Sequence, residues 1–440
     1  MSEEVQTTKE GLVRTIGTKA LGINIFNMVV GGGIFVLPGV VASYLGASAI
    51  IAYLICGVAV SLIFLCYAEI GTRVRRSGGS YAYIEDAFGP FAGFIASILL
   101  WFGWAVLSDA ALLVALTNTV AIAFPQLEDT ILRPIFMAGL LAFLVFMNVR
   151  GAKSGVRLYV INSIAKLIPL GILLIFGLFA INIDNLKITE WPTMDQIGAS
   201  ALILFFVFSG AESALNASGE IKNPEKTVPR GIFLGMGIIL FLYLGLQTVA
   251  QGVLGSELGN NLGAPLSATA EIVFGSWGGK MIIVGTAISI FATLSGDILV
   301  TPRVIFASAR DGNLPKILAK VHPKYRTPYV SVIVFAVFMF IIATSGTFST
   351  LAVLASGSIL LIYAGVSLSV LKVRKRDGAP TKDQFTIPGK GTVPILSLLL
   401  ISWVLLQMTG EEALGLLGLV GISTTIALIM RFKNSKKPRE

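Results

Sequence analysis

Residues 22–44, GINIFNMVVGGGIFVLPGVVASY, are long and apolar enough to cross a bilayer, yet three successive glycines at positions 31–33 interrupt them. Glycine weakens a helix and lets another group come close to the backbone. Glycines also serve helix packing in membranes, but a packing motif needs only one helix face, whereas three in a row cover the whole circumference. Pro38 adds a second weak point. The pattern predicts a membrane helix that is discontinuous at the glycines.

A second stretch, residues 199–220 (ASALILFFVFSGAESALNASGE), has the same organisation. It is apolar up to Ser209 and Gly210 and then places a carboxylate, Glu212, at the break. Where a helix opens, the N–H groups of one half face an anion and the C=O groups of the other half face a cation. We therefore predict that the two breaks face each other and bind the zwitterionic end of an amino acid.

The composition indicates that most of this chain lies in a lipid bilayer. Of its 440 residues, 55% are hydrophobic and only 13% are charged, which excludes a soluble globular protein. A hydrocarbon core of about 30 Å needs roughly 20 helical residues. We predict an all-α integral membrane protein with twelve transmembrane helices, at approximately 19–44, 47–70, 88–123, 132–149, 155–181, 195–219, 231–253, 279–308, 328–345, 348–371, 393–409 and 412–430.

The lysines and arginines predict the orientation. Of 33 such residues, only Arg133, Lys187 and Lys280 fall in loops on one side and Lys166 inside a span, while the others lie in the termini and loops of the other side. Because basic loops stay in the cytoplasm, both termini are expected there. The net charge of +9 then reflects topology and an anionic inner leaflet, and no nucleic-acid partner is expected.

Four ionisable side chains fall inside the predicted spans: Asp109, Lys166, Glu212 and Asp297. Such residues are costly in hydrocarbon, so they usually face a partner or an aqueous cavity. Lys166 lies about 13 Å inside the basic boundary at Arg157, at 1.5 Å per helical residue. It must therefore bind carbonyls or a carboxylate, or lose its proton.

The spans also predict an internal repeat. Asp109 and Asp297 occupy the third spans of two five-helix halves, and the sixth span resembles the first; five spans between counterparts invert the orientation. The residues between the second and third spans, 67–90, are expected to be a cytoplasmic loop. The expected organisation is a cytoplasmic N-terminal segment (1–18), a first repeat (19–181), a second repeat (195–371), two further helices (393–430) and a cytoplasmic tail (431–440).

Other classes of protein fit this sequence less well. Paired membrane aspartates suggest an intramembrane aspartyl protease, but the second reads LSGD at residues 294–297 and lacks the first glycine of a GxGD signature. No TVGYG-like filter or charged ring indicates a channel. The single histidine, His322, offers no metal site, and no cofactor is expected. Cys56 and Cys66 are about 15 Å apart along one helix and cannot pair.

Several motifs together point to a known family. GGGIFVLPG in the first span, AKLIPL in the fifth, FSGAESALNASGEIKNPEKTVPRGI in the sixth and ARDGNLPKILAKVHPKYRTP after the eighth resemble the amino acid-polyamine-organocation (APC) superfamily of transporters. The resemblance covers essentially the whole chain. It implies the fold of the sodium-coupled bacterial leucine transporter, in which spans one to five and six to ten are inverted repeats, helices one and six are discontinuous, and two extra helices follow.

The resemblance also implies roles at the two breaks. The N–H groups of Gly32 and Gly33, in the same break as Gly31, would bind the substrate carboxylate. The carbonyls of Val29, Phe206 and Ser209 would take the amino group.

Further roles concern the side chains. Phe206 occupies the place of an aromatic gate, and Asp297 that of a substrate contact where relatives have a tryptophan or a small residue. Glu212 matches a glutamate proposed as a proton switch, and Lys166 a lysine whose ammonium replaces a sodium ion. Asp109 is a further site or gate candidate, because an intramembrane carboxylate needs a partner.

We therefore expect a secondary active transporter of amino acids that works by alternating access, independently of sodium, through proton-coupled symport or exchange. Its partners would be an amino acid, protons and the lipid bilayer, in a bacterial inner membrane. Asp109 and Asp297 leave the far end of the substrate open. They fit a cationic amino acid or polyamine antiporter if they are charged, and a neutral amino acid if they are paired or protonated.

Overall fold

The computed structural model of this chain describes residues 16–74, 78–150, 155–215, 221–310, 314–381 and 384–435. Within these ranges the secondary structure is helical, with a single β-bridge between Ile16 and Ile221. Residues 1–15 of the expected N-terminal segment and 436–440 of the expected tail lie outside them. Seven helices of the described part are long and apolar enough to cross a membrane. The prediction of an all-helical, multi-pass membrane protein is confirmed.

The outer surface agrees with a membrane environment. Large apolar side chains are exposed on the peripheral helices, among them Phe143 at 52%, Phe241 at 71% and Leu399 at 62% of their surface. Water would penalise such a surface, whereas lipid does not. Buried apolar residues from many helices form the interior.

The first predicted break is present. Helix α1 (Thr18–Val29) ends before the glycines, a short 3₁₀ turn η1 (Gly33–Phe35) follows, and α2 (Leu37–Leu45) resumes the span. The N–H of Val30 closes the last turn of α1 on Phe26 O, and the N–H of Gly31 bonds to Val29 O two residues back. This tight reversal ends the helical hydrogen-bond ladder at the glycines, as the sequence predicts.

The second break lies between α9 (Met194–Phe208) and α10 (Ala211–Leu215). A capping box starts α9, because the side chains of Thr193 and Gln196 each bond to the other's backbone. At its far end Gly210 has φ +118°, a conformation that side-chain-bearing residues rarely adopt. The glycine therefore fixes the point at which this helix stops.

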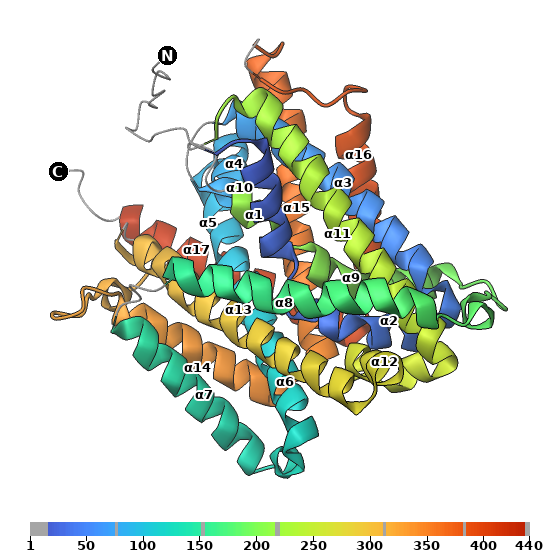
Figure 1. Cartoon of the computed structure of the whole chain (residues 1–440). Helices are drawn as coiled ribbons and strands as arrows, with labels where there is room; N and C mark the ends of the chain where they lie inside the picture. Colours follow the sequence, from blue (N-terminus) through green and yellow to red (C-terminus); the bar gives the residue numbers. More distant parts are fainter. Residues whose placement is uncertain are drawn as a thin grey trace, which may run out of the picture.

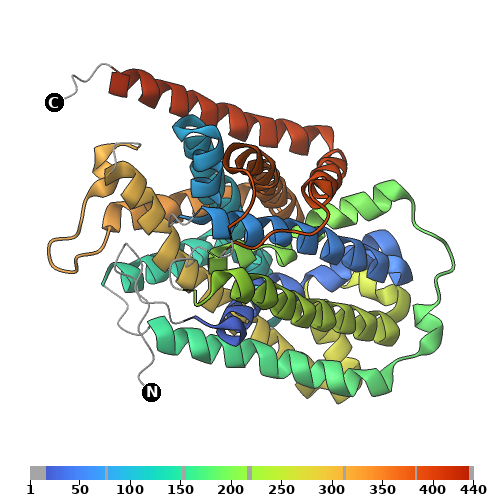
Figure 2. The same ribbon diagram turned by 90° about the horizontal axis from the view of Figure 1, so that it is seen from above.

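The remaining helices surround these two. In Figure 1 α1 stands near the centre of the molecule, and α8 and α13 run across the view below it. Figure 2 shows α17, in red, along one edge and α8, in green, along the opposite edge. The other α-helices are α3 (Ala49–Arg73), α4 (Gly79–Phe88), α5 (Pro90–Ile98), α6 (Leu107–Ala123), α7 (Leu132–Val149), α8 (Gly155–Gly177), α11 (Pro224–Leu254), α12 (Pro265–Phe274), α13 (Ser276–Arg310), α14 (Tyr329–Ser345), α15 (Phe348–Asp377), α16 (Thr392–Leu405) and α17 (Gly410–Ser435).

Three elements differ from the sequence prediction. The expected loop at 67–90 contains helix α4, because Ser80 and Tyr83 are buried: the Ser80 Oγ lies 2.7 Å from the Tyr67 hydroxyl, and the rings of Tyr67 and Tyr83 pack edge to face. Helix α12 is a short helix where no element was predicted. A π-helix, η3 (Leu99–Val106), joins α5 to α6 inside the long third span.

Candidate functional site

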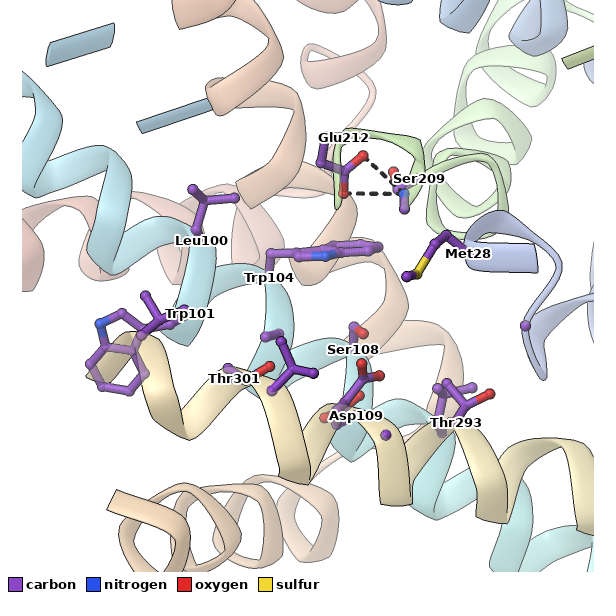
Figure 3. Close-up of a pocket in the computed structure, with 18 of the residues that line it drawn as sticks. Met28, Leu100, Trp101, Trp104, Ser108, Asp109, Ser209, Glu212, Thr293 and Thr301 are labelled. Atoms are coloured by element: carbon purple, nitrogen blue, oxygen red, sulfur yellow. Dashed lines mark hydrogen bonds between the residues drawn. The ribbon is translucent and has the colours of Figure 1, made fainter. Parts of the chain in front are cut away.

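The two helix breaks lie against each other. A Cβ added to Gly210 would lie 2.8 Å from Met28 O and 3.5 Å from Val29 Cα. From α11, the Tyr243 hydroxyl lies within hydrogen-bond distance of both Val29 O (3.2 Å) and Val207 O (3.1 Å), one carbonyl on each broken helix. Met28, Ser209 and Glu212 are neighbours in Figure 3. The predicted juxtaposition is therefore present, and a buried tyrosine links its two sides.

Glu212 binds the opened backbone at the second break. Its carboxyl oxygens accept the N–H of Gly210 at 3.1 and 2.9 Å, and the Tyr363 hydroxyl from α15 donates to Oε2 at 2.7 Å. The side chain is only 3% exposed. A buried carboxyl group costs little free energy only when donors surround it, and here the opened backbone and one tyrosine supply them.

Lys166 binds the backbone carbonyls at the first break. Its Nζ donates to Asn27 O at 2.9 Å and to Val30 O at 2.5 Å, and the residue is 3% exposed. These carbonyls belong to the end of α1, where the helix dipole is negative. Of the partners that the sequence allowed for Lys166, the structure therefore selects backbone carbonyls.

The glycines between the two halves differ in their surroundings. A Cβ on Gly32 would lie 2.3 Å from Ile290 Cγ1, and one on Gly33 would lie 2.5 Å from Val207 Cγ1, whereas the nearest atom to a Cβ on Gly31 is 4.0 Å away. No residue in the described ranges accepts a hydrogen bond from the N–H of Gly32 or Gly33. These two N–H groups are thus free for an anionic ligand.

One cavity of about 1650 Å³ brings the candidate residues together. It also reaches Gly89 at the junction of α4 and α5, and Arg303 near the end of α13. Every site residue that the sequence indicated lines it: Val29, Gly31, Gly32, Gly33, Asp109, Lys166, Phe206, Ser209, Glu212 and Asp297.

Aromatic rings divide this cavity. Phe206 packs against Trp104 with ring centroids 6.0 Å apart and against Phe348 at 5.7 Å. Trp104 belongs to the π-helix η3, and in Figure 3 its indole extends between Glu212 and Asp109. π-helical turns are frequent at functional sites.

Sequence reasoning missed three of these residues: Trp104, Tyr243 and Tyr363. Each has an aromatic ring with a polar tip inside an apolar span, and buried hydroxyl and indole groups usually have a hydrogen-bond partner. That requirement marks them as site candidates, but only the structure identifies the acceptors of the two tyrosine hydroxyls and the packing of Trp104 on Phe206.

Asp109 and Asp297 are partners of each other. They come from α6 and α13, and their carboxyl groups lie close enough to interact directly. Asp109 is 1% exposed, and its Oδ2 has no hydrogen-bond partner among the described residues. The sequence predicted each aspartate as a site residue, and the structure adds their direct contact.

Two broken helices with buried charges at their ends and a cavity between them are typical of a membrane transporter. The sequence profile of the amino acid permease family matches residues 16–429, and the chain belongs to that family. This confirms the resemblance to the APC superfamily. The family consists of transporters and not of enzymes, so the contacting aspartates belong to a transport protein.

Three curated relatives are similar to this chain over most of its length. The chain is 30% identical over 434 residues to the serine/threonine exchanger SteT of Bacillus subtilis (strain 168), covering 95% of this chain and 97% of that protein. It is 24% identical over 454 residues to the branched-chain amino acid permease BcaP of the same organism, covering 97% and 95%. It is 27% identical over 416 residues to the Asc-type amino acid transporter 1 of Mus musculus, covering 88% and 75%.

Proposed function

We propose that this protein is a secondary active transporter of amino acids that works by alternating access, independently of sodium, through proton symport or exchange. One observation carries the proposal: the two broken helices meet at a cavity and leave the N–H groups of Gly32 and Gly33 without acceptors among the described residues. These groups lie at the N-terminal end of a half-helix, where a carboxylate is stabilised.

The amino group of the substrate would bind the carbonyls of Phe206, Ser209 and Val29. Val29 O already has the N–H of Gly31 at 2.8 Å and the Tyr243 hydroxyl at 3.2 Å. Because a carbonyl oxygen has two lone pairs, an ammonium would displace Tyr243 from it. Substrate binding would thereby act directly on the link between the two breaks.

Sodium independence follows from the position of Lys166. A sodium ion at the end of α1 would need backbone carbonyls as ligands, and the Lys166 ammonium already donates to two of them. A second cation there would meet both occupied ligands and like-charge repulsion. Lys166 and Glu212 are also the buried groups at the breaks that can exchange a proton with the cavity, which makes them candidates for coupling.

The cavity extends to Gly89 and Arg303 at the ends of α5 and α13, and along α6 and α7 to Val120 and Phe136 near the opposite side. By the distribution of Lys and Arg, the end at Gly89 and Arg303 faces the cytoplasm. We propose on the same basis that both termini are cytoplasmic, in a bacterial inner membrane.

We further propose twelve spans with an inverted repeat of five plus five. The pieces α1–α2 and α9–α10 would be counterparts, as would the spans that supply Asp109 and Asp297. The helices α16 and α17 would follow the two repeats.

Counterflow in proteoliposomes tests the function. Vesicles loaded with unlabelled amino acids should accumulate the same labelled amino acid transiently, equally well in sodium and in choline buffer. A second series with and without a pH gradient separates symport from exchange. Accumulation that disappears when sodium is removed would contradict the role given to Lys166, and the absence of counterflow with every amino acid would contradict the function.

A further inference from the structure

Binding of the carboxylate and the amino group that all amino acids share does not explain the contact between Asp109 and Asp297. The pair lines the same cavity as the helix breaks but comes from α6 and α13. In Figure 3 Ser108 and Asp109 lie on the other side of Trp104 from Glu212 and Ser209. Gly32 packs against Ile290 of α13, and Asp297 lies seven residues further along that helix, about 10 Å at 1.5 Å per residue. A ligand held by its carboxylate at Gly32 and Gly33 would therefore reach this pair with its far end.

The charge of the pair restricts what that end can be. The sequence favours a neutral substrate if the aspartates are paired, but here the partner is a second carboxyl group and not a cation. Two carboxyl groups that share one proton keep one negative charge. In the described part of the chain no lysine or arginine forms an ion pair with either aspartate. Lys166 is bound to backbone carbonyls instead, and Arg303, six residues after Asp297, is exposed.

The free acceptor points the same way. Asp109 Oδ2 is enclosed and accepts no hydrogen bond from an N–H or hydroxyl group of the described residues, and burying such an atom costs free energy unless a donor reaches it. An apolar side chain would fill the space and leave both the acceptor and the charge without compensation. A group that is both a donor and a cation would satisfy both.

We propose that the Asp109–Asp297 pair binds the far end of the substrate and selects amino acids whose side chain ends in a positively charged nitrogen. The inference rests on the proposed transport function and specifies its substrate class. The common end of the substrate is bound by backbone N–H and C=O groups, and the pair supplies the selectivity.

Lysine and norleucine are suitable probes, because they have the same chain length and differ at the end, where an ammonium replaces a methyl group. The measurement is counterflow of each labelled amino acid by the full-length protein in proteoliposomes at one pH. We expect the wild type to have a KM for lysine on the order of 100-fold lower than for norleucine, the scale expected for an unpaired buried charge. Asp109→Asn and Asp297→Asn should lose this preference and still carry norleucine.

Asp195→Asn is the matched control, since Asp195 is exposed in the first turn of α9 and away from the cavity. It should keep the wild-type preference. If a single variant carries neither probe, the double variant Asp109→Asn/Asp297→Asn replaces it, because two amides can retain a mutual hydrogen bond. Norleucine transport by the double variant supports the proposal, and the loss of transport of both probes overturns it.

The inference and the function fail in different ways. A wild type that exchanges norleucine as well as or better than lysine overturns the inference but confirms amino acid transport. So does a lysine preference that survives in Asp297→Asn. A wild type that exchanges no amino acid at all overturns the proposed function.

Discussion

Single residues decide whether the first break can form. Gly32 and Gly33 are packed so closely that a Cβ on either would meet a neighbouring side chain, whereas Gly31 faces open space. The three glycines are identical in sequence, so only their packing separates their roles. Gly32 and Gly33 permit close contact, whereas the reversal that the Gly31 N–H makes with Val29 O is centred on Val30, at φ −74° and ψ 84°, and does not require a glycine.

A pair of alanine variants tests this difference. Gly32→Ala would force a Cβ to within 2.3 Å of Ile290 Cγ1, and such overpacking costs about 1–3 kcal/mol. We expect a lower midpoint of thermal unfolding in detergent for Gly32→Ala and a clearly smaller change for Gly31→Ala. Equal midpoints for the two variants would contradict the packing that we describe.

Lys166 is the second residue whose environment makes a clear prediction. Lys166→Met keeps an unbranched chain but leaves the carbonyls of Asn27 and Val30 without their donor, at a cost of about 1–3 kcal/mol for an unsatisfied buried group. We expect a lower unfolding midpoint and the loss of counterflow. Lys280→Met, at an exposed lysine in the first turn of α13, should change neither; the same behaviour in both variants would refute the role of Lys166.

At the level of elements, α11 holds the two broken helices together. The Tyr243 hydroxyl has one proton and lies within donating distance of both Val29 O on α1 and Val207 O on α9, so its removal takes away the donor that the two sides of the junction share. Tyr243→Phe keeps the ring and should lower stability by about 1 kcal/mol, the value of a typical hydrogen bond, and slow counterflow. The measurements are the unfolding midpoint and the initial counterflow rate.

Tyr44→Phe provides the comparison for Tyr243→Phe. Tyr44 lies on α2 and is 44% exposed, so water can replace its hydroxyl. This variant should match the wild type in both measurements. A Tyr243→Phe variant that also matches the wild type would show that the junction does not depend on this hydroxyl.

The elements also show what a sequence can predict. The breaks at Gly32 and Gly210 were predictable because a helix ends for local reasons, and the buried charges were predictable because hydrocarbon penalises them anywhere. The contact of Asp109 with Asp297 was not, because it depends on how α6 packs on α13. The short helices α4 and α12 were missed because neither is long enough to produce a membrane-span signal.

At the level of the whole molecule, Glu69 ties three distant segments together at one end of the bundle. This residue of α3 is fully buried and accepts hydrogen bonds from Arg73 at 3.0 Å, from Arg374 of α15 at 2.7 Å and from the N–H of Ile387 at 2.9 Å. Arg374 also bonds to Lys390 O, close to the start of α16. The cluster fixes the connection between α15 and α16 onto α3.

Removing the charge of Glu69 should destabilise the whole protein. Glu69→Gln would leave two arginines facing a neutral amide, and breaking a buried ion pair costs about 3–5 kcal/mol. Lys187→Gln breaks the exposed pair with Asp184 and should cost less than about 1 kcal/mol. Thermal unfolding of both variants in detergent checks the contrast, and equal shifts would count against a structural role for the Glu69 cluster.

The volume of the cavity makes the equilibrium between open and closed states sensitive to osmolality. If the cavity of 1650 Å³ empties when the protein closes, about one litre of solvent leaves per mole of protein, so 1 mol per litre of an excluded polymer would favour closure by roughly 0.6 kcal/mol. Where the closed form already predominates, a cysteine introduced at Ser108 should then react about threefold more slowly with a maleimide in such a solution, by the relation between free energy and population; where the open form predominates, the rate should fall less. The osmolality of the surrounding solution would thus shift the fraction of carriers that are open.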